Sequence, residues 1–223
     1  MCVAPTPPDT AAIAIFDLDG TLVRFDTFVP FLWSCLWRRP ARWWTVPRLL
    51  SAALAFKLGW RSNAWLKALF LRAIVGGRSD AQLDGRVQGF VRRVLASGLN
   101  PQCLERLQAH QRAGHRVVLA TASPDLYVEP LAEALGIVEV ECTRLLRDGA
   151  GRLTGALDGG NCYGPDKARR VSQRLDAVPP AQWMLYTDHQ ADLPLARQAG
   201  RVVLVKPTPE MQGLMAEKAE LLA

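Results

Sequence analysis

The chain has 223 residues, of which 49% are hydrophobic and 22% charged. This composition excludes a disordered chain and suits one large domain, or a core domain with an insertion. The formal net charge of +6 favours an anionic partner, such as a phosphate, a membrane or a nucleic acid. The five cysteines are scattered without a C-x-x-C pair, which argues against a disulfide framework and a zinc site and indicates a reducing compartment.

The chain begins with residues 1–10, which lack the basic region and the long apolar stretch of a secretion signal. We therefore expect an N-terminal tail there and a cytoplasmic protein. Residues 11–16 are apolar and predict a buried strand that ends at the run Asp17-Leu18-Asp19-Gly20-Thr21. Such a run by itself also fits a surface turn. In open α/β sheets, however, ligands bind at the carboxyl ends of strands, so two acids at this point predict a site.

A long stretch over residues 27–97 is predicted to be helical, and strands and helices alternate after it. This alternation predicts a parallel sheet covered on both faces. We therefore expect an α/β, Rossmann-like parallel sheet core formed by residues 11–26 and 98–223, with residues 27–97 inserted as a helical cap after the first strand. The expected elements are a helix from Asn100 to Gly114, a strand over 116–121, a helix with Ser123 as its N-cap that reaches Gly136, a short strand and a hairpin within 137–158, a helix from Pro165, a strand over 183–187, a helix near Leu193 and a strand over 201–205.

The later elements also carry polar residues at useful positions. Thr121 closes the second predicted strand, Asp188 follows the strand over 183–187, and Asp192 comes four residues later. Lys167 lies at the start of the intervening helix. Any one of these residues could be an ordinary cap or a solvated side chain. Because strand ends meet at one edge of a parallel sheet, all of them can share one site with the first two acids.

These four ordered motifs resemble those of the haloacid dehalogenase superfamily of phosphatases, and the resemblance covers about residues 11–206. The early insertion, the Leu153-Thr154-Gly155 strand and the run from Asn161 to Lys167 resemble the branch that contains phosphoserine phosphatase and phosphatidylglycerophosphatase C. The first motif is matched by Asp17 to Thr21, the second by Thr121, the third by Lys167, and the fourth by Asp188 and Asp192. The fourth motif departs from the common pattern, because Thr187 and His189 occupy places that commonly hold Gly and Ser. Both carboxylates of that motif remain, so we expect metal binding to survive.

The resemblance implies a Mg²⁺-dependent phosphatase with an aspartyl-phosphate intermediate. Asp17 would be the nucleophile, Asp19 the general acid and base, and Thr121 and Lys167 would stabilise the phosphoryl group. Asp26 is assigned to substrate binding. An equally good explanation is that its carboxylate stabilises the N-terminus of a helix. The other assigned residues are Thr21, Ala122 and Ser123 for substrate binding, and Asp17, Asp19 (through its backbone carbonyl), Asp188 and Asp192 for Mg²⁺, with Asp192 acting through water or by orienting Lys167 instead.

Residues 27–79 contain nine basic residues, no acid and six of the seven tryptophans. Such a segment fits peripheral attachment to an anionic membrane surface, on the inner face of the membrane. The alternative is a soluble cap whose tryptophans are core and whose cations attract substrate. The purest apolar run, 49–56, is shorter than the ~20 residues that a span requires. No nucleic-acid recognition motif is found, so we expect no nucleic-acid partner.

The predicted substrate is a phosphorylated small metabolite or a lipid headgroup phosphate. Two alternatives remain at this point. One is a membrane-surface lipid phosphatase of the phosphatidylglycerophosphatase type, and the other is a catalytically silent, membrane-associated adaptor that uses the fold as a scaffold.

Overall fold

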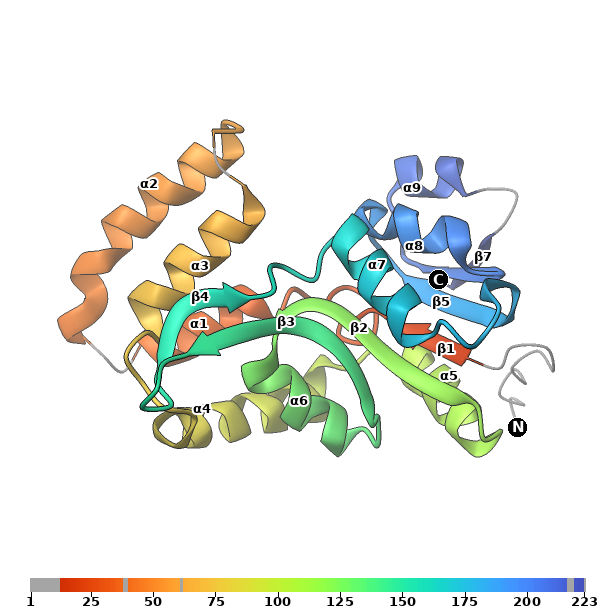
Figure 1. Cartoon of the computed structure of the whole chain (residues 1–223), viewed down its shortest axis with the longest axis horizontal. Coiled ribbons are helices and arrows are strands. Elements are labelled where there is room, and N and C mark those ends of the chain that lie inside the picture. Colours follow the sequence, from red (N-terminus) through yellow and green to blue (C-terminus); the bar gives the residue numbers. More distant parts are fainter. Residues whose placement is uncertain (1–12, 38–39, 61, 216–218, 223) are drawn as a thin grey trace.

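Seven strands form one sheet in the order β4-β3-β2-β1-β5-β6-β7 (Figure 1). The computed structural model describes residues 13–37, 40–60, 62–215 and 219–222, so the predicted tail over 1–10 lies outside the described residues. Only the β3–β4 pair is antiparallel among the described strands, and the other pairs are parallel. The strands are β1 (Ile13–Phe16), β2 (Arg116–Pro124), β3 (Glu139–Arg147), β4 (Leu153–Asp158), β5 (Trp183–Thr187), β6 (Arg201–Val205) and β7 (Ala219–Leu222).

Helices cover both faces of this sheet, and β1 alternates between the two layers. Ile13 and Ile15 pack in the cluster formed with α7, α8 and α9, whereas Ala14 and Phe16 pack on the opposite face with α5 and α6. A central strand buried on both faces reads as a continuous apolar run, which explains the sequence pattern before Asp17. These helices are α5 (Pro101–Arg112), α6 (Asp125–Ala134), α7 (Pro165–Arg174), α8 (Leu193–Gln198) and α9 (Pro209–Leu214).

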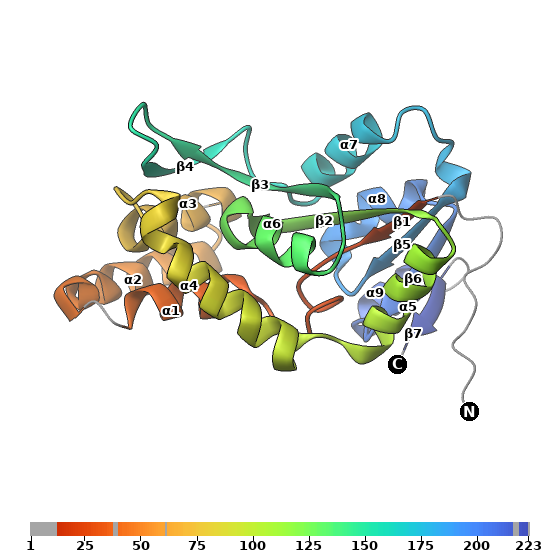
Figure 2. The ribbon, with the colours of Figure 1, turned by 90° about the horizontal axis from the view of Figure 1, so that it is seen from below.

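The chain between β1 and β2 carries the helical insertion, by which we mean residues 27–97. Figures 1 and 2 show α1 to α4 grouped at one end of the molecule, toward which the carboxyl ends of β1 and β2 point. We propose the predicted boundaries, 27–97 for a cap and 11–26 with 98–223 for a core, as the division of the chain. The helices of the insertion are α1 (Phe28–Leu36), α2 (Val46–Lys57), α3 (Asn63–Ile74) and α4 (Asp80–Arg93), with a 3-10 turn over Pro40–Thr45 and a π turn over Val94–Gly98.

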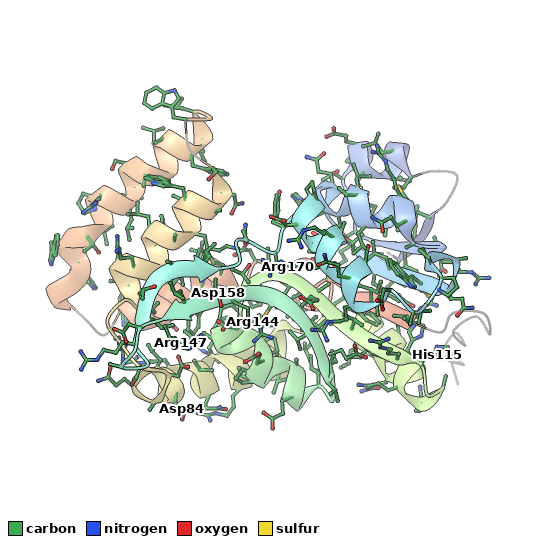
Figure 3. The ribbon with its side chains drawn as sticks, viewed as in Figure 1. Asp84, His115, Arg144, Arg147, Asp158 and Arg170 are labelled. Carbon is green, nitrogen blue, oxygen red and sulfur yellow. The ribbon has the colours of Figure 1, made fainter. Side chains whose placement is uncertain are left out.

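The β3–β4 hairpin leaves the sheet and packs on the insertion. Gly155 of β4 lies so close to α3 that a Cβ there would stand 2.4 Å from Cα of Arg72. Arg147 of β3 (labelled in Figure 3) forms ion pairs with Asp80 of α4 at 2.8 Å and with Asp125 of α6 at 3.0 Å. The hairpin therefore fastens the insertion to the helices of the sheet core.

The α/β fold class, with a parallel sheet flanked by helices, is confirmed. One local prediction is wrong: Ser123 is not the N-cap of α6. Strand β2 runs on to Pro124, which holds the cap position in an extended conformation, and no side chain caps the helix. The Ser123 hydroxyl instead donates to Asp19. Helix α9 and strand β7 were not predicted.

The tryptophans of the insertion are not core residues, so that part of the soluble-cap alternative is wrong. Their exposed fractions range from 38% at Trp65 to 74% at Trp44, whereas the seventh tryptophan, Trp183, is 2% exposed in the sheet core. Over the described residues, every helix is too short or too polar to cross a bilayer.

Candidate active site

A cavity of about 640 Å³ opens between the carboxyl ends of the strands and the insertion. Five carboxylates line it, from Asp17 and Asp19 after β1, from Asp26, and from Asp188 and Asp192 after β5. The parallel register explains this meeting, because β1 pairs with β5 along its whole length and with β2 on the other side. Residues separated by 150 positions or more therefore lie in one site.

Lys167 forms the centre of the site, at the N-terminal turn of α7. Its ammonium donates to Asp17 Oδ1 at 2.8 Å and lies 2.7 Å from Asp192 Oδ1, and all three side chains are buried. Burial by itself would lower the pKa of Lys167, but the two carboxylates outweigh it and raise that pKa above its usual range. Lys167 is therefore a fixed cation. Burial raises the pKa of Asp17, and Lys167 opposes that shift.

Asp192 forms an ion pair with Lys167, and the neighbouring Thr187 positions the Asp192 carboxylate. Thr187 Oγ1 donates to Asp192 Oδ2 at 2.8 Å, so the threonine that departs from the family pattern supplies a bond that Gly could not. His189, the second departure, accepts the backbone N–H of Ala191 on Nδ1 at 3.0 Å and so takes an N-cap role. Both departures thus have structural functions in this loop.

The Asp19 carboxylate is held by two short hydrogen bonds. Its Oδ1 accepts the backbone N–H of Thr27 and its Oδ2 accepts the Ser123 hydroxyl, each at 2.6 Å. Ser123 in turn accepts from Tyr127 at 2.9 Å. Burial raises the pKa of Asp19, although these hydrogen bonds act in the opposite direction. A carboxyl group with a raised pKa holds its proton to higher pH, which suits a proton donor.

Asp188 lies against the turn that follows Asp17. It accepts the Thr21 hydroxyl at 3.2 Å, and a Cβ on Gly20 would stand 2.0 Å from its Oδ2. Gly20 also has φ +81°, so this turn needs glycine both for its backbone and for the approach of the carboxylate. Burial raises the pKa of Asp188. Thr21 is buried behind Asp188 and is not among the residues that line the cavity.

The donors present suit a divalent metal with few protein ligands. Among the described residues, no group of three or more His, Cys, Asp or Glu side chains is arranged as a cage. Asp17 and Asp188 are hard oxygen donors on adjacent strands, and Mg²⁺ is commonly held by one or two carboxylates with retained waters. The five lining carboxylates and the three lining cations, Arg24, Lys67 and Lys167, leave two formal negative charges, which a divalent cation would balance before an anionic phosphate enters.

Lys67, from α3 of the insertion, is a cavity residue that the sequence reasoning did not single out. It is 7% exposed, and its ammonium donates to the backbone carbonyl of Ala122 at 2.5 Å and to Asn161 Oδ1 at 2.8 Å. Burial lowers the pKa of Lys67 to about 8. Among nine basic residues of an acid-free segment it carries no local sequence signal, because its burial depends on how α3 docks on the core.

The remaining predicted residues lie at or beside the cavity. Thr121 is buried in the lining, where its Oγ1 accepts the backbone N–H of Ser123 at 3.1 Å. Ala122 lines the cavity and offers its carbonyl to Lys67. Asp26 lines the cavity from an exposed position, and its Oδ1 accepts the N–H of Phe28 at 3.0 Å at the start of α1. That contact agrees with the helix N-terminus explanation for Asp26.

The sequence matches a family model over residues 14–197, described as haloacid dehalogenase-like hydrolase. Among curated proteins it is 35% identical over 162 residues to protein CicA of Caulobacter vibrioides, covering 72% of this chain and 71% of that protein. It is 28% identical over 217 residues to phosphoserine phosphatase SerB1 of Mycobacterium tuberculosis, covering 95% of this chain and 70% of that protein.

Solved structures share the fold at lower identity. A protein of unknown function from Bordetella pertussis Tohama I superposes with a TM-score of 0.82 at 23% identity, covering 96% of this chain and 99% of that one. A probable phosphoserine phosphatase from Vibrio cholerae gives a TM-score of 0.71 at 17% identity, covering 96% of this chain and 62% of that one. At these identities the likeness concerns the fold.

Proposed function

Because the chain belongs to the haloacid dehalogenase-like hydrolases and is a phosphatase, we propose that it hydrolyses a phosphate monoester through an aspartyl-phosphate on Asp17. The observation that carries this proposal is the buried Asp17–Lys167–Asp192 ion pair network. It holds one oxygen of Asp17 on a fixed cation at 2.8 Å and leaves the other oxygen for attack on phosphorus. The bond from phosphorus to the leaving oxygen then breaks.

In this proposal Asp19 moves the protons. In the first step Asp19 donates its proton to the leaving oxygen, so that an alcohol departs. In the second step a water attacks the phosphorus of the aspartyl-phosphate and gives its proton to Asp19, and the Asp17–phosphorus bond breaks to release phosphate. The hydrogen bonds from Thr27 and Ser123 would keep Asp19 aimed in both steps, which makes Ser123 a positioning residue in our proposal.

We propose that Asp17, Asp188 and the backbone carbonyl of Asp19 hold Mg²⁺, which would supply charge neutralisation for an anionic phosphate beside carboxylates. Thr21 would position Asp188, because its hydroxyl donates to that carboxylate. Asp192 would act by orienting Lys167, since it accepts from Lys167 and from Thr187.

The substrate would lie with its phosphate against Thr121 and Lys167 and its remainder against the insertion. That part of the cavity is apolar, lined by Phe28, Leu66 and Phe70, with Lys67 as its buried cation. These residues support a monoester that has both an apolar and an anionic part. A lipid headgroup phosphate has both features and would be taken from a membrane surface by an enzyme attached peripherally through residues 27–79. The SerB1 similarity supports a small metabolite such as phosphoserine instead.

The test is phosphate release from an aryl phosphate, from phosphoserine and from a lipid phosphate monoester, each with and without Mg²⁺. We expect Mg²⁺-dependent release from the aryl phosphate, and a loss of about a thousandfold or more in kcat for Asp17→Asn. Asp84→Asn is the matched control, because it removes an exposed carboxylate of α4 (Figure 3) that does not line the cavity. Turnover by Asp17→Asn at the rate of the control would rule out the aspartyl-phosphate. Absence of turnover on every ester, with a folded protein that binds vesicles, would favour the silent adaptor.

A further inference from the structure

The outward side of the helical insertion carries a cluster of exposed tryptophans. Trp33, Trp37, Trp43, Trp44 and Trp60 are between 46% and 74% exposed. The rings of the first three follow one another at centroid distances of 5.7 and 5.8 Å. Large apolar side chains that gather on a surface mark a binding face, whereas scattered ones need no explanation. Ten of the sixteen exposed large apolar side chains of the described residues lie within residues 27–79.

Helix α2 extends this surface. It buries Leu49 and Ala52, but Leu50 and Leu54 are 66% and 58% exposed, and Leu58 follows at 53%. The spacing of four residues places these three leucines on one side of the helix. Figure 1 shows α2 at the end of the molecule remote from β7 and α9. The exposed side of α2 therefore carries these leucines beside Arg48, Ser51 and Lys57, and no described element covers the leucines.

A groove between α1 and α4 adds cations to the tryptophans. It encloses about 690 Å³ and is lined by Trp33 of α1, by Trp37 directly after that helix, and by Arg86 and Arg93 of α4. Gly85 and Gly89 also line the groove, and because they have no side chains they leave space along α4. Among the described residues neither arginine forms an ion pair with a carboxylate; each donates only a long 3.4 Å hydrogen bond to a backbone carbonyl. These guanidinium groups are therefore available for an anion.

We propose that this surface, comprising the outer side of α1 and α2, the exposed tryptophans and the Trp33–Arg93 groove, docks on an anionic phospholipid bilayer. Tryptophan rings lie at headgroup depth, and guanidinium groups bind lipid phosphates. Residues 27–79 contain nine cations and no carboxylate, which matches an anionic surface. A second copy of the chain fits less well, because two copies of an acid-free face would oppose cations to cations.

The docking surface is separate from the catalytic cavity. The catalytic cavity and the groove share no lining residue, although α1 contributes to both. It gives Phe28 and Val29 to the catalytic cavity and Trp33 to the groove. Vesicle binding is therefore measurable without turnover. A failure of this proposal leaves the proposed phosphatase chemistry intact, and the reverse also holds.

The test is co-sedimentation of the full chain with vesicles of phosphatidylcholine alone and of phosphatidylcholine with phosphatidylglycerol, at about 0.1 M and about 0.5 M salt. We expect binding to the anionic vesicles, weaker binding at high salt and little binding to the neutral vesicles. Trp44→Ser/Trp60→Ser and Arg86→Gln/Arg93→Gln should each weaken binding about tenfold or more. Val138→Ser/Leu214→Ser is the control, because it removes two exposed apolar side chains outside the insertion.

The control variant should bind within about twofold of the wild type, and all variants should keep the circular dichroism spectrum of the wild type, which verifies their fold without relying on turnover. Equal vesicle binding by the tryptophan, arginine and control variants would overturn the proposal. The proposal would also be overturned if the wild type did not bind anionic vesicles at low salt. A dimer in size-exclusion chromatography that Trp44→Ser/Trp60→Ser converts to a monomer, without vesicle binding, would assign the surface to self-association instead.

Discussion

Gly20 determines how closely Asp188 approaches the Asp17 turn. Gly20→Ala adds a Cβ at 2.0 Å from Asp188 Oδ2 and puts alanine at φ +81°. We expect Asp188 to be displaced, with a rise of at least about tenfold in the Mg²⁺ concentration needed for half-maximal activity. Gly77→Ala is the matched control, because Gly77 has φ +77° but open space around its Cβ position. Both variants incur roughly 1–2 kcal/mol of backbone strain, so a shift seen equally in both would contradict the role of Asp188.

The lowered pKa of Lys67 predicts that kcat/KM depends on pH in the alkaline range. Burial lowers its pKa to about 8, so as pH rises through 8 the site loses a cation and kcat/KM for an anionic ester should fall. Lys67→Met should show a low, flatter profile in this range, and Lys67→Arg should keep its activity to higher pH. The exposed Lys57→Met is the control. A wild-type decline that persists unchanged in Lys67→Met would assign the titration to another group.

The same shift has the opposite sign for stability. The folded pKa of Lys67 lies below its unfolded value, so the unfolded chain binds more protons between about pH 8 and 10.4. The buried ammonium therefore destabilises the fold below pH 8, and that cost fades as pH rises through this window. As pH rises above about 8, activity should therefore fall while the free energy of unfolding increases.

At the scale of elements, the contact between β4 and α3 fixes the insertion over the cavity. Gly155→Ala would set a Cβ 2.4 Å from the backbone of Arg72, which lies five residues after Lys67 in α3. We expect α3 to shift, with a loss of about 2 kcal/mol beyond the strain of φ +82°, or roughly 4–8 °C in Tm. Gly151→Ala, at φ +69° with nothing near its Cβ position, gives the strain alone. If the two variants have the same Tm, the contact between β4 and α3 tolerates the added Cβ and the prediction is wrong.

The core strands could be predicted because each is a short apolar run with a polar residue at its carboxyl end. The same signal could not say which sides of the insertion helices are covered. Trp33 and Trp183 are equally apolar in sequence, yet one is 52% and the other 2% exposed. That difference depends on which element packs over each residue, which hydropathy does not encode. Helix α9 has six residues and β7 has four, too few to establish a period.

For the whole molecule, the meeting of Asp17, Asp19, Thr121, Lys167, Asp188 and Asp192 at one sheet edge could be predicted, because strand order in a parallel sheet brings strand ends together. The residues that hold these side chains in place could not be predicted from the sequence. Ser123 on Asp19 and Thr187 on Asp192 depend on side-chain directions, and Lys67 depends on the docking of α3. Site members that follow strands were thus visible in the sequence, and those supplied by tertiary packing were not.

The position of β1 between β2 and β5 has a consequence for biosynthesis. The ion pair of Asp17 with Lys167 spans 150 positions of the chain, and the bond from Thr21 to Asp188 spans 167. A nascent chain that ends before Trp183 therefore lacks β5, and one long side of β1 has no strand to pair with. Unpaired apolar strands recruit other chains. Synthesis must therefore reach β5 before the second long side of β1 is paired, and until then Asp17 follows a strand with an open edge.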